Sequence, residues 1–298
     1  MKKIMVLVAA VALVAGSAMT AIAADWHFYG HARVSTFVSD VEEQGPATST
    51  ITGLPKQDTT NYSQGLQSNA RIGAKVRVSD NLTGGFEFGA RVNVRKLYGE
   101  WYFDGGSLLV GQDYSPLNYL YSNGVYDSDF ALKGQGGVYS DREAMIRFKF
   151  GDFVVAAISP DIDDLGSGFT TETSMPAFEA NYNLKLDAVS VNLGAGYQTY
   201  ELLGTPTGDH DVDTYVVALG ARGTLGPAYL AGSVYMGENV GNLIEVSLDG
   251  DNNRNDGYAD FNGTDVLDND ALGFSVVAGF KANDMFAFEA GYGYVEVE

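Results

Sequence analysis

The chain has 298 residues, of which 45% are hydrophobic, and it carries a formal net charge of −20 at pH 7 with no cysteine. This hydrophobic content is too high for a disordered acidic chain, and the negative charge excludes a global basic surface for nucleic acid. A bundle of transmembrane helices is also excluded. The only sustained apolar run, at residues 4–15, is shorter than the roughly 20 residues that a spanning helix needs.

That apolar run is predicted to be part of a signal peptide. Lys2 and Lys3 precede the run, and Ala21-Ile22-Ala23 supplies the small residues at which signal peptidase cleaves. An uncleaved N-terminal anchor helix is the alternative. We assign residues 1–23 to the signal peptide and residues 24–298 to one exported domain, which must fold without disulfides because it contains no cysteine.

The exported part of the chain is predicted to be a series of strands, because apolar residues recur at every second position. The pattern begins at Trp26 and is repeated up to Val295. We count thirteen strands, and the clearest lie in residues 26–38, 69–78, 86–94, 178–184, 189–197, 274–280 and 286–294. Two of the thirteen must fit between Gly84 and Phe103, with a boundary near Arg95 and Lys96 that no Gly, Pro or Asp marks.

Two architectures give this alternation, and they differ in which face is buried. In a soluble sandwich the apolar face is the core, whereas in an outer-membrane barrel it meets lipid and the polar face lines a wet lumen. Short links alternate along the chain with long ones, as periplasmic turns alternate with external loops in a barrel. The predicted long loops are residues 40–68, 115–141, 160–175, 201–211 and 238–270.

The aromatic residues favour the barrel. Tyrosine and tryptophan suit a membrane interface, because an apolar ring and a polar tip match that boundary. Several of them fall on the predicted strands or at their ends, among them Trp26, Trp101, Tyr197, Tyr215 and Tyr292. We therefore predict an all-β fold, a transmembrane antiparallel β-barrel. An odd strand count would leave an open edge, so we expect further strands beyond Glu298.

Three segments resemble the Gram-negative general porins. Residues 69–94, NARIGAKVRVSDNLTGGFEFGARVNV, resemble the second and third strands of that family, with Ser79-Asp80-Asn81-Leu82 as the turn between them. Residues 97–116, LYGEWYFDGGSLLVGQDYSP, are similar to the next hairpin, and FYGHARVSTF is similar to the first strand. The resemblance implies a trimeric barrel of 16 strands in the outer membrane, about 13 of them present here, whose third loop narrows the channel.

The chain departs from the family pattern in three places. Gln112 stands where many members carry an arginine in the lumen. The second external loop, which in the family reaches over a neighbouring subunit, is nearly missing. Glu298 stands in place of the terminal aromatic residue that the family's assembly machinery recognises, which fits an incomplete barrel.

Strand parity predicts a basic wall in the lumen. Eight basic residues are expected on the polar face of the first six strands, namely Arg33, Arg71, Lys75, Arg77, Arg91, Arg95, Arg147 and Lys149. The loop at residues 115–141 contributes the acids Asp127 and Asp129, so a field across the constriction is the hypothesis. The alternative is that these bases solvate a polar wall or pair with Glu87 and Glu179.

Metal and enzyme sites have weaker support. In the acidic loop 238–270, Asp251, Asn253 and Asn255 have the spacing of a calcium loop, but Asp256 and Asn262 break the pattern, so a weak Ca²⁺ site is only a hypothesis beside a solvated loop. We predict no other cofactor. No hydrolase or phosphate-loop motif occurs, so we expect no enzyme.

The sequence thus predicts an outer-membrane porin for passive diffusion of small hydrophilic solutes and ions. Its expected partners are outer-membrane lipid, lipopolysaccharide and two further copies in a homotrimer, with no nucleic acid. A non-conducting adhesion or binding barrel is the main alternative, and a membrane-embedded hydrolase is a more remote one.

Overall fold

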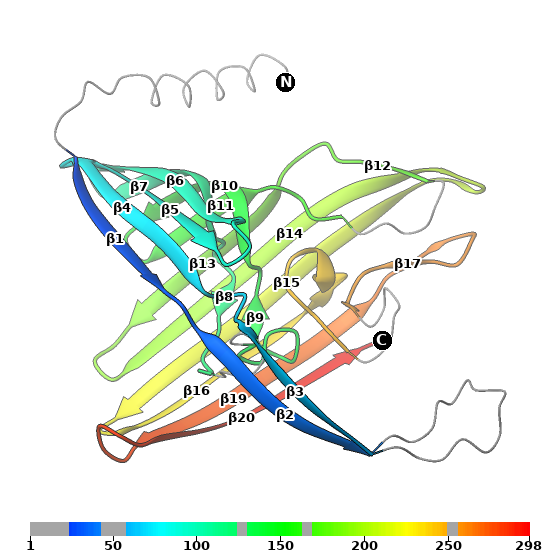
Figure 1. The fold of residues 1–298 in the computed structure, drawn as a ribbon. Coiled ribbons are helices and arrows are strands. Elements are labelled where there is room, and N and C mark those ends of the chain that lie inside the picture. The colour runs from blue at the N-terminus through cyan, green and yellow to red at the C-terminus, as the bar shows by residue number, and fades with distance from the viewer. Residues whose placement is uncertain (1–23, 43–57, 124–129, 163–168, 249–255) are drawn as a thin grey trace.

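The computed structural model describes residues 24–123, 130–162, 169–248 and 256–298, except for residues 43–57 (Figure 1). The predicted signal peptide, residues 1–23, lies outside the described residues, as do Asp127 and Asp129 and the central residues of the suggested calcium loop, 251–255. No helix in the described part of the chain is long and apolar enough to cross a membrane.

Within the described residues, the main sheet is a path of thirteen antiparallel strands that pair in chain order, as many as predicted, and β12 adds a fourteenth strand beside β14. The thirteen are β1 (Asp25–His31), β4 (Arg71–Ser79), β5 (Leu82–Gly89), β6 (Val94–Phe103), β7 (Gly106–Tyr114), β10 (Arg142–Phe150), β11 (Phe153–Ile158), β13 (Ala177–Lys185), β14 (Val189–Thr205), β15 (Gly208–Leu225), β16 (Ala228–Glu238), β19 (Asp270–Lys281) and β20 (Ala287–Val297).

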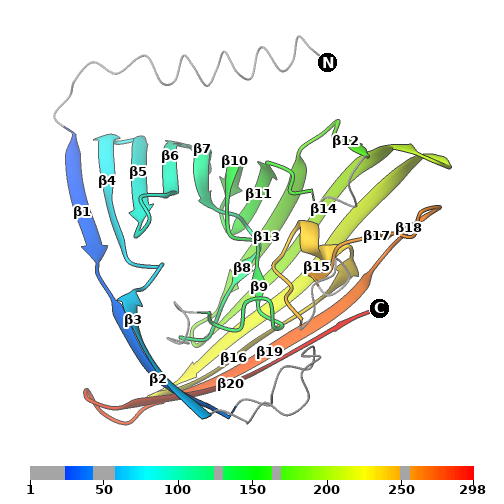
Figure 2. The same cartoon turned by 45° about the vertical axis from the view of Figure 1, so that its right-hand side comes forward.

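The strands form a strongly curved sheet with a concave face, which Figures 1 and 2 show from two directions. β1 and β20 are the two ends of the pairing order, and no pairing between them is recorded among the described residues. The smaller elements are β2 (Val34–Glu42) with β3 (Asp58–Leu66), β8 (Asn118–Tyr119) with β9 (Val138–Tyr139), β12 (Thr170–Glu172) on β14, β17 (Asp260–Phe261) with β18 (Val266–Leu267), and the 3₁₀ helix η1 (Val240–Asn242).

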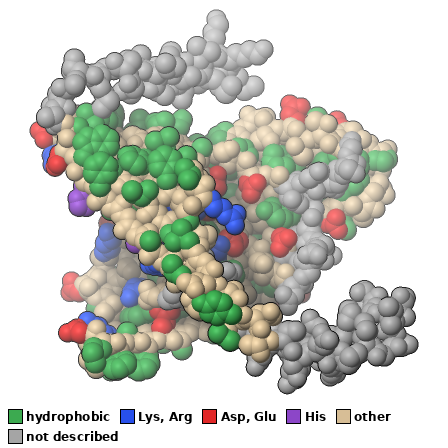
Figure 3. Space-filling model, viewed as in Figure 1, with side chains coloured by type: hydrophobic (Ala, Val, Ile, Leu, Met, Phe, Trp, Pro, Cys, Tyr) green, Lys and Arg blue, Asp and Glu red, His purple; other side chains and the backbone are tan. Residues whose placement is uncertain are grey.

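The apolar face of the sheet points outward. On β15, Tyr215, Val217 and Leu219 are 45–48% exposed, whereas the alternate residues Val216 and Ala218 are buried. A sandwich would bury the face that is exposed here, so the alternation supports a barrel. Figure 3 shows hydrophobic side chains gathered on the outer surface and Lys and Arg side chains within the hollow. The predicted all-β transmembrane barrel is therefore confirmed as the fold class.

Two strand boundaries differ from the prediction. The first strand ends at His31, and the chain then leaves the main sheet to form the β2–β3 hairpin. The boundary predicted near Arg95 and Lys96 was wrong. The turn comes earlier, at residues 90–93, and it contains Val92 with φ 56°. A β-branched residue rarely adopts this left-handed conformation, so Val92 did not indicate a turn.

The predicted long loop at residues 201–211 was also wrong. β14 and β15 have 17 and 18 residues, and only Pro206 and Thr207 separate them. His210 therefore lies on β15, where its ring packs against Phe261 at 5.8 Å between ring centroids. The polar and acidic composition of this hairpin tip predicted a loop. The strands form there because β14 and β15 pair with each other, and sequence pattern alone does not reveal such pairing.

Candidate pore constriction

The predicted constriction loop, residues 115–141, lies between the end of β7 and the start of β10, and the structure describes its residues 115–123 and 130–141. It folds onto the concave face of the sheet, where β8 and β9 pair (Figure 2). Its apolar residues Leu117, Tyr119 and Val138 are at most 3% exposed and belong to one cluster with wall residues. The loop is therefore packed into the lumen by hydrophobic burial.

Glycines on the wall make room for the loop. A Cβ at residue 194 on β14 would lie 1.8 Å from the Tyr119 hydroxyl oxygen, and one at residue 220 on β15 would lie 2.5 Å from that of Tyr121. The Tyr121 hydroxyl oxygen also accepts a hydrogen bond from Asn192 Nδ2 at 3.1 Å. These two strands thus present a shallow surface on which the tyrosines lie.

Glu179 on β13 holds one end of the constriction loop. Its carboxylate is 1% exposed in the structure and accepts hydrogen bonds from the Leu117 backbone N–H at 2.9 Å and from the Ser140 hydroxyl. Leu117 and Ser140 lie on the two limbs of the loop, so one carboxylate ties both limbs to the wall. Sequence reasoning considered Glu179 only as a partner for a base.

Glu289 on β20 holds another part of the loop, and sequence reasoning missed it. It accepts hydrogen bonds from Ser122 Oγ at 2.8 Å, from the Asn123 backbone N–H at 2.8 Å and from Asn123 Nδ2 at 2.7 Å. The hydroxyl of Tyr229 on β16 donates to the same carboxylate. The constriction loop therefore reaches from β13 to β20. Only the parity of Glu289 on its strand could have indicated this inward position.

Two of the eight predicted bases pair with one buried acid. Glu87 accepts from Arg95 Nε at 2.7 Å and lies 3.4 Å from Arg71 Nη1. Its side chain is 4% exposed. A buried carboxylate is tolerated when charged partners pair with it. Arg71 and Arg95 therefore follow the alternative stated above, in which the bases pair with Glu87.

A second paired group contains a base that the parity argument missed. Asp113 on β7 lies 2.7 Å from Lys96 Nζ and 3.2 Å from Arg147 Nη1. The turn at residues 90–93 interrupts β5 and β6 and resets the alternation, so that Lys96 contacts this wall residue. A boundary placed correctly at that turn would have identified Lys96 from sequence.

The remaining predicted bases are spread along the wall and its rims. Lys75 is exposed on the same face of β4 as Arg71. Arg77 pairs with Asp80 at 3.1 Å at the β4–β5 turn. Arg33 lies between β1 and β2, and Arg91 lies in the β5–β6 turn. The predicted strand position of Arg91 was thus wrong, because the chain turns before reaching it.

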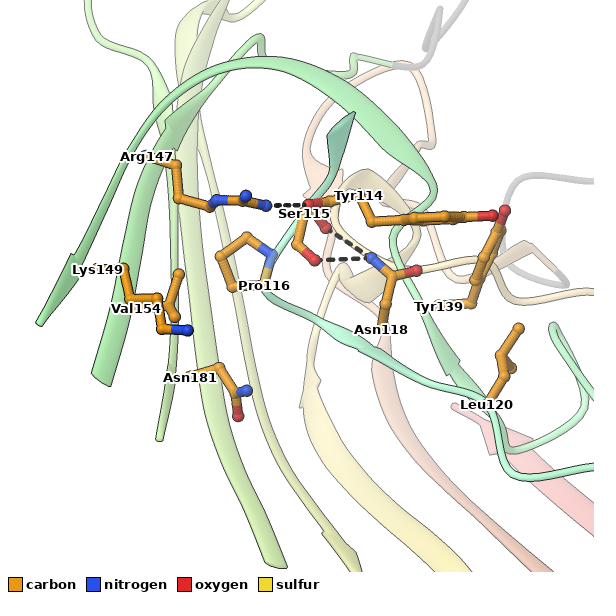
Figure 4. Close-up of a pocket in the computed structure, with 10 residues that line it drawn as sticks. All are labelled: Tyr114, Ser115, Pro116, Asn118, Leu120, Tyr139, Arg147, Lys149, Val154 and Asn181. Atoms are coloured by element: carbon orange, nitrogen blue, oxygen red, sulfur yellow. Dashed lines mark hydrogen bonds between the residues drawn. The ribbon is translucent and has the colours of Figure 1, made fainter. Parts of the chain in front are cut away.

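A cavity of about 560 Å³ separates the basic wall from the constriction loop. Arg147 and Lys149 approach it from β10, whereas Asn118, Leu120 and Tyr139 approach it from the loop (Figure 4). Arg147 Nη1 donates to the Tyr114 carbonyl oxygen at 3.0 Å. The lining thus combines two cations with amide and phenol groups, which suits water and hydrophilic solutes.

Tyr139 stays neutral in this cavity at ordinary pH. Burial raises the pKa of its phenol, and a hydrogen bond from its hydroxyl to Asp141 Oδ1 at 2.6 Å raises that pKa further. Among the described residues, no group of three or more acids or histidines is arranged to hold a metal ion. The calcium hypothesis concerns residues outside that part of the chain, so it stays a prediction.

No family model matches this chain, and no curated protein is detectably similar to it. Solved structures do share its fold. The outer membrane channel DcaP of Acinetobacter baumannii has 18% identity and a TM-score of 0.71, over 92% of this chain and 79% of that one. An anion-selective porin from Comamonas acidovorans has 13% identity and a TM-score of 0.55, over 92% and 80%.

OmpF of Salmonella typhi is also similar, with 15% identity and a TM-score of 0.52 over 90% of this chain and 78% of that one. At such identities the shared property is the fold. The order of thirteen strands, the outward apolar face and the loop folded into the hollow agree with this likeness. The resemblance seen in the sequence is therefore confirmed at the level of architecture: this chain has the fold of the Gram-negative outer-membrane porins.

Proposed function

We propose that this protein is an outer-membrane porin, a water-filled channel through which small hydrophilic solutes and ions diffuse passively. The observation that carries the proposal is the position of the constriction loop, which packs inside a sheet whose apolar face points outward and leaves a polar cavity beside Arg147 and Lys149. A channel needs a wet lumen and a constriction with charge across it. No catalytic residue is part of the proposal.

We also propose that the chain is exported, that it lies in the outer membrane and that it assembles as a homotrimer. Residues 1–23 act as the signal peptide, and residues 24–298 form the barrel in contact with outer-membrane lipid and lipopolysaccharide. Assembly as a homotrimer is supported by the structural neighbour OmpT of Vibrio cholerae, which is described in a trimer form. The basic wall and the acids Asp127 and Asp129 set the field across the constriction.

The purified protein, inserted into planar lipid bilayers, is expected to give stepwise single-channel currents that are proportional to voltage near zero. A protein that inserts, as shown by protease protection, but gives no current steps would overturn the channel and favour a non-conducting binding barrel. The hydrolase alternative would instead require ester hydrolysis by the same preparation.

Replacing Arg147 and Lys149 together by glutamine is expected to shift the reversal potential in a salt gradient toward the equilibrium potential of the cation. The change removes two positive charges beside the cavity, and selectivity in a narrow pore follows the charge of its lining. Arg77→Gln is the matched control, because Arg77 lies at the β4–β5 turn and does not line this cavity. Equal reversal potentials for the double variant and the wild type would show that Arg147 and Lys149 do not determine the ion selectivity of the pore.

Leu219→Arg is expected to lower the free energy of unfolding in lipid by about 2–4 kcal/mol, the cost of an arginine at mid-bilayer on the lipid face of a barrel. Leu219 is 45% exposed on the outward face of β15. The control is Ser190→Arg on β14, which faces the lumen opposite Arg222, so only the smaller cost of like-charge repulsion is expected. Denaturant unfolding in vesicles measures both, and equal losses would argue against lipid at Leu219.

A further inference from the structure

A second segment enters the lumen, although sequence reasoning assigned it to an external acidic loop. This inward segment, residues 239–247, follows β16 and contains η1. Its apolar residues Val240, Leu243, Ile244 and Val246 are at most 5% exposed and share a cluster with Leu117, Tyr119 and Val138 of the constriction loop. The four apolar side chains are buried against the loop that narrows the pore.

Backbone hydrogen bonds join the inward segment to the constriction loop. The Glu245 N–H donates to the Tyr139 carbonyl oxygen at 2.8 Å, and the Ser247 N–H donates to the Gly134 carbonyl oxygen at 2.9 Å. Lys133 Nζ also lies 3.2 Å from Glu245 Oε2. The inward segment thus pairs with the returning limb of the constriction loop, and the two form one unit.

Asparagines fix the other side of the inward segment to the wall. Asn239 is fully buried, with its Nδ2 donating to the Asp213 carbonyl oxygen at 2.8 Å and its Oδ1 accepting from the Asn269 N–H at 2.9 Å. Asn242 Nδ2 donates to Thr214 Oγ1 at 2.9 Å. The bonds from Asn269 N–H to Asn239 and from Asn242 to Thr214 are buried, so breaking either costs more than breaking an exposed bond would.

The inward segment borders a second cavity, of about 250 Å³, in whose lining Asp141 is paired with Arg142 at 2.8 Å and Glu245 with Lys133 at 3.2 Å. Its lining includes the acids Asp141, Glu143, Asp161 and Glu245 and no base. Residues Gly241–Glu245 form one side of it. The constriction loop therefore separates a cavity bordered by Arg147 and Lys149 from a cavity bordered by carboxylates.

We infer that the inward segment is a specificity-determining element, an inference that rests on the proposed channel function. By filling the space behind the constriction loop, it keeps solutes on the side of Arg147 and Lys149 and away from Glu143 and Asp161. The charge preference of the pore is thus decided by an apolar segment that itself adds no charge to the basic cavity. Loosening that segment opens an acid-lined route to water and cations.

The test is the variant Leu243→Ser with Ile244→Ser, measured in planar bilayers under a salt gradient. Loss of apolar burial detaches the inward segment. Conductance is therefore expected to rise, and the reversal potential is expected to shift toward the equilibrium potential of the cation. Leu243→Met with Ile244→Val keeps the segment apolar and is expected to match the wild type. Adding Glu143→Gln and Asp161→Asn to the serine variant is expected to restore the wild-type reversal potential.

The outcomes separate the two proposals. A wild-type protein that never conducts contradicts the channel itself. A conducting wild type combined with a serine variant of unchanged selectivity contradicts the role of the inward segment, as does a shift that the two acid substitutions fail to reverse. If the serine variant does not fold, Asn242→Ala, which removes only the bond to Thr214, is expected to shift selectivity in the same direction, and an unchanged value contradicts the inference.

Discussion

Gly194→Val is expected to displace the constriction loop and raise single-channel conductance. A Cβ at this position would lie 1.8 Å from the Tyr119 hydroxyl oxygen and 2.6 Å from Leu117 Cδ2, distances that no packed side chains tolerate. Overpacking of this kind costs typically about 1–3 kcal/mol. Since β14 is fixed by its neighbours β13 and β15, the loop is the part that must move.

The matched control for Gly194→Val is Gly99→Val. Gly99 lies on β6, and a Cβ there would meet nothing within 4 Å, so the same added volume is expected to leave conductance unchanged. Current recordings at fixed voltage compare the two variants with the wild type. If Gly194→Val keeps the wild-type conductance and its noise, the loop does not limit the current where it lies against β14.

Glu179→Ala is expected to free both limbs of the constriction loop at once. The substitution leaves the buried Leu117 N–H without its acceptor, which costs about 1–3 kcal/mol, and it removes the partner of the Ser140 hydroxyl as well. The hydrogen-bonded groups belong to the loop, so losing these bonds is expected to make the loop move. Single-channel records should then show fluctuating conductance and frequent substates. Unfolding of the whole barrel is a lesser consequence, since the strand pairing of β13 is retained.

Glu179→Gln separates the loss of charge from the loss of the acceptor. Its amide oxygen can still accept from the Leu117 N–H, so conductance noise is expected to lie between the wild type and Glu179→Ala. Glu172→Ala, at an exposed position on β12, serves as the control. Steady, wild-type current from Glu179→Ala would show that apolar packing alone holds the loop, and that the carboxylate has no positioning role.

The sequence determined the fold class because alternation is a local property. Residues two apart on a strand share a face whatever the partner strand is, so runs such as Val189, Val191 and Leu193 predicted both the strands and their apolar face. The boundaries of the constriction loop, residues 115–141, followed from the same interruption of pattern. The basic residues of β4 and β10 could be placed on one face for this reason.

The turn at residues 90–93 marks the limit of that argument. Parity is reset wherever a turn or bulge intervenes, and in the turn at residues 90–93 the left-handed residue is Val92, a β-branched residue that rarely adopts that conformation. Arg91 was therefore expected on a strand, while Lys96 was overlooked. A single misplaced strand boundary changes the assigned face of every residue up to the next boundary.

Only the tertiary structure decided which charges are free and which are paired, and where the loops lie. Glu87 with Arg71 and Arg95, Glu179 with the constriction loop, and the inward segment at residues 239–247 depend on contacts between residues far apart in sequence. Short-range pattern fixes the face of each side chain, because it depends on backbone geometry alone. The path of a loop depends on which distant surface can bury its apolar residues, and no local pattern contains that information.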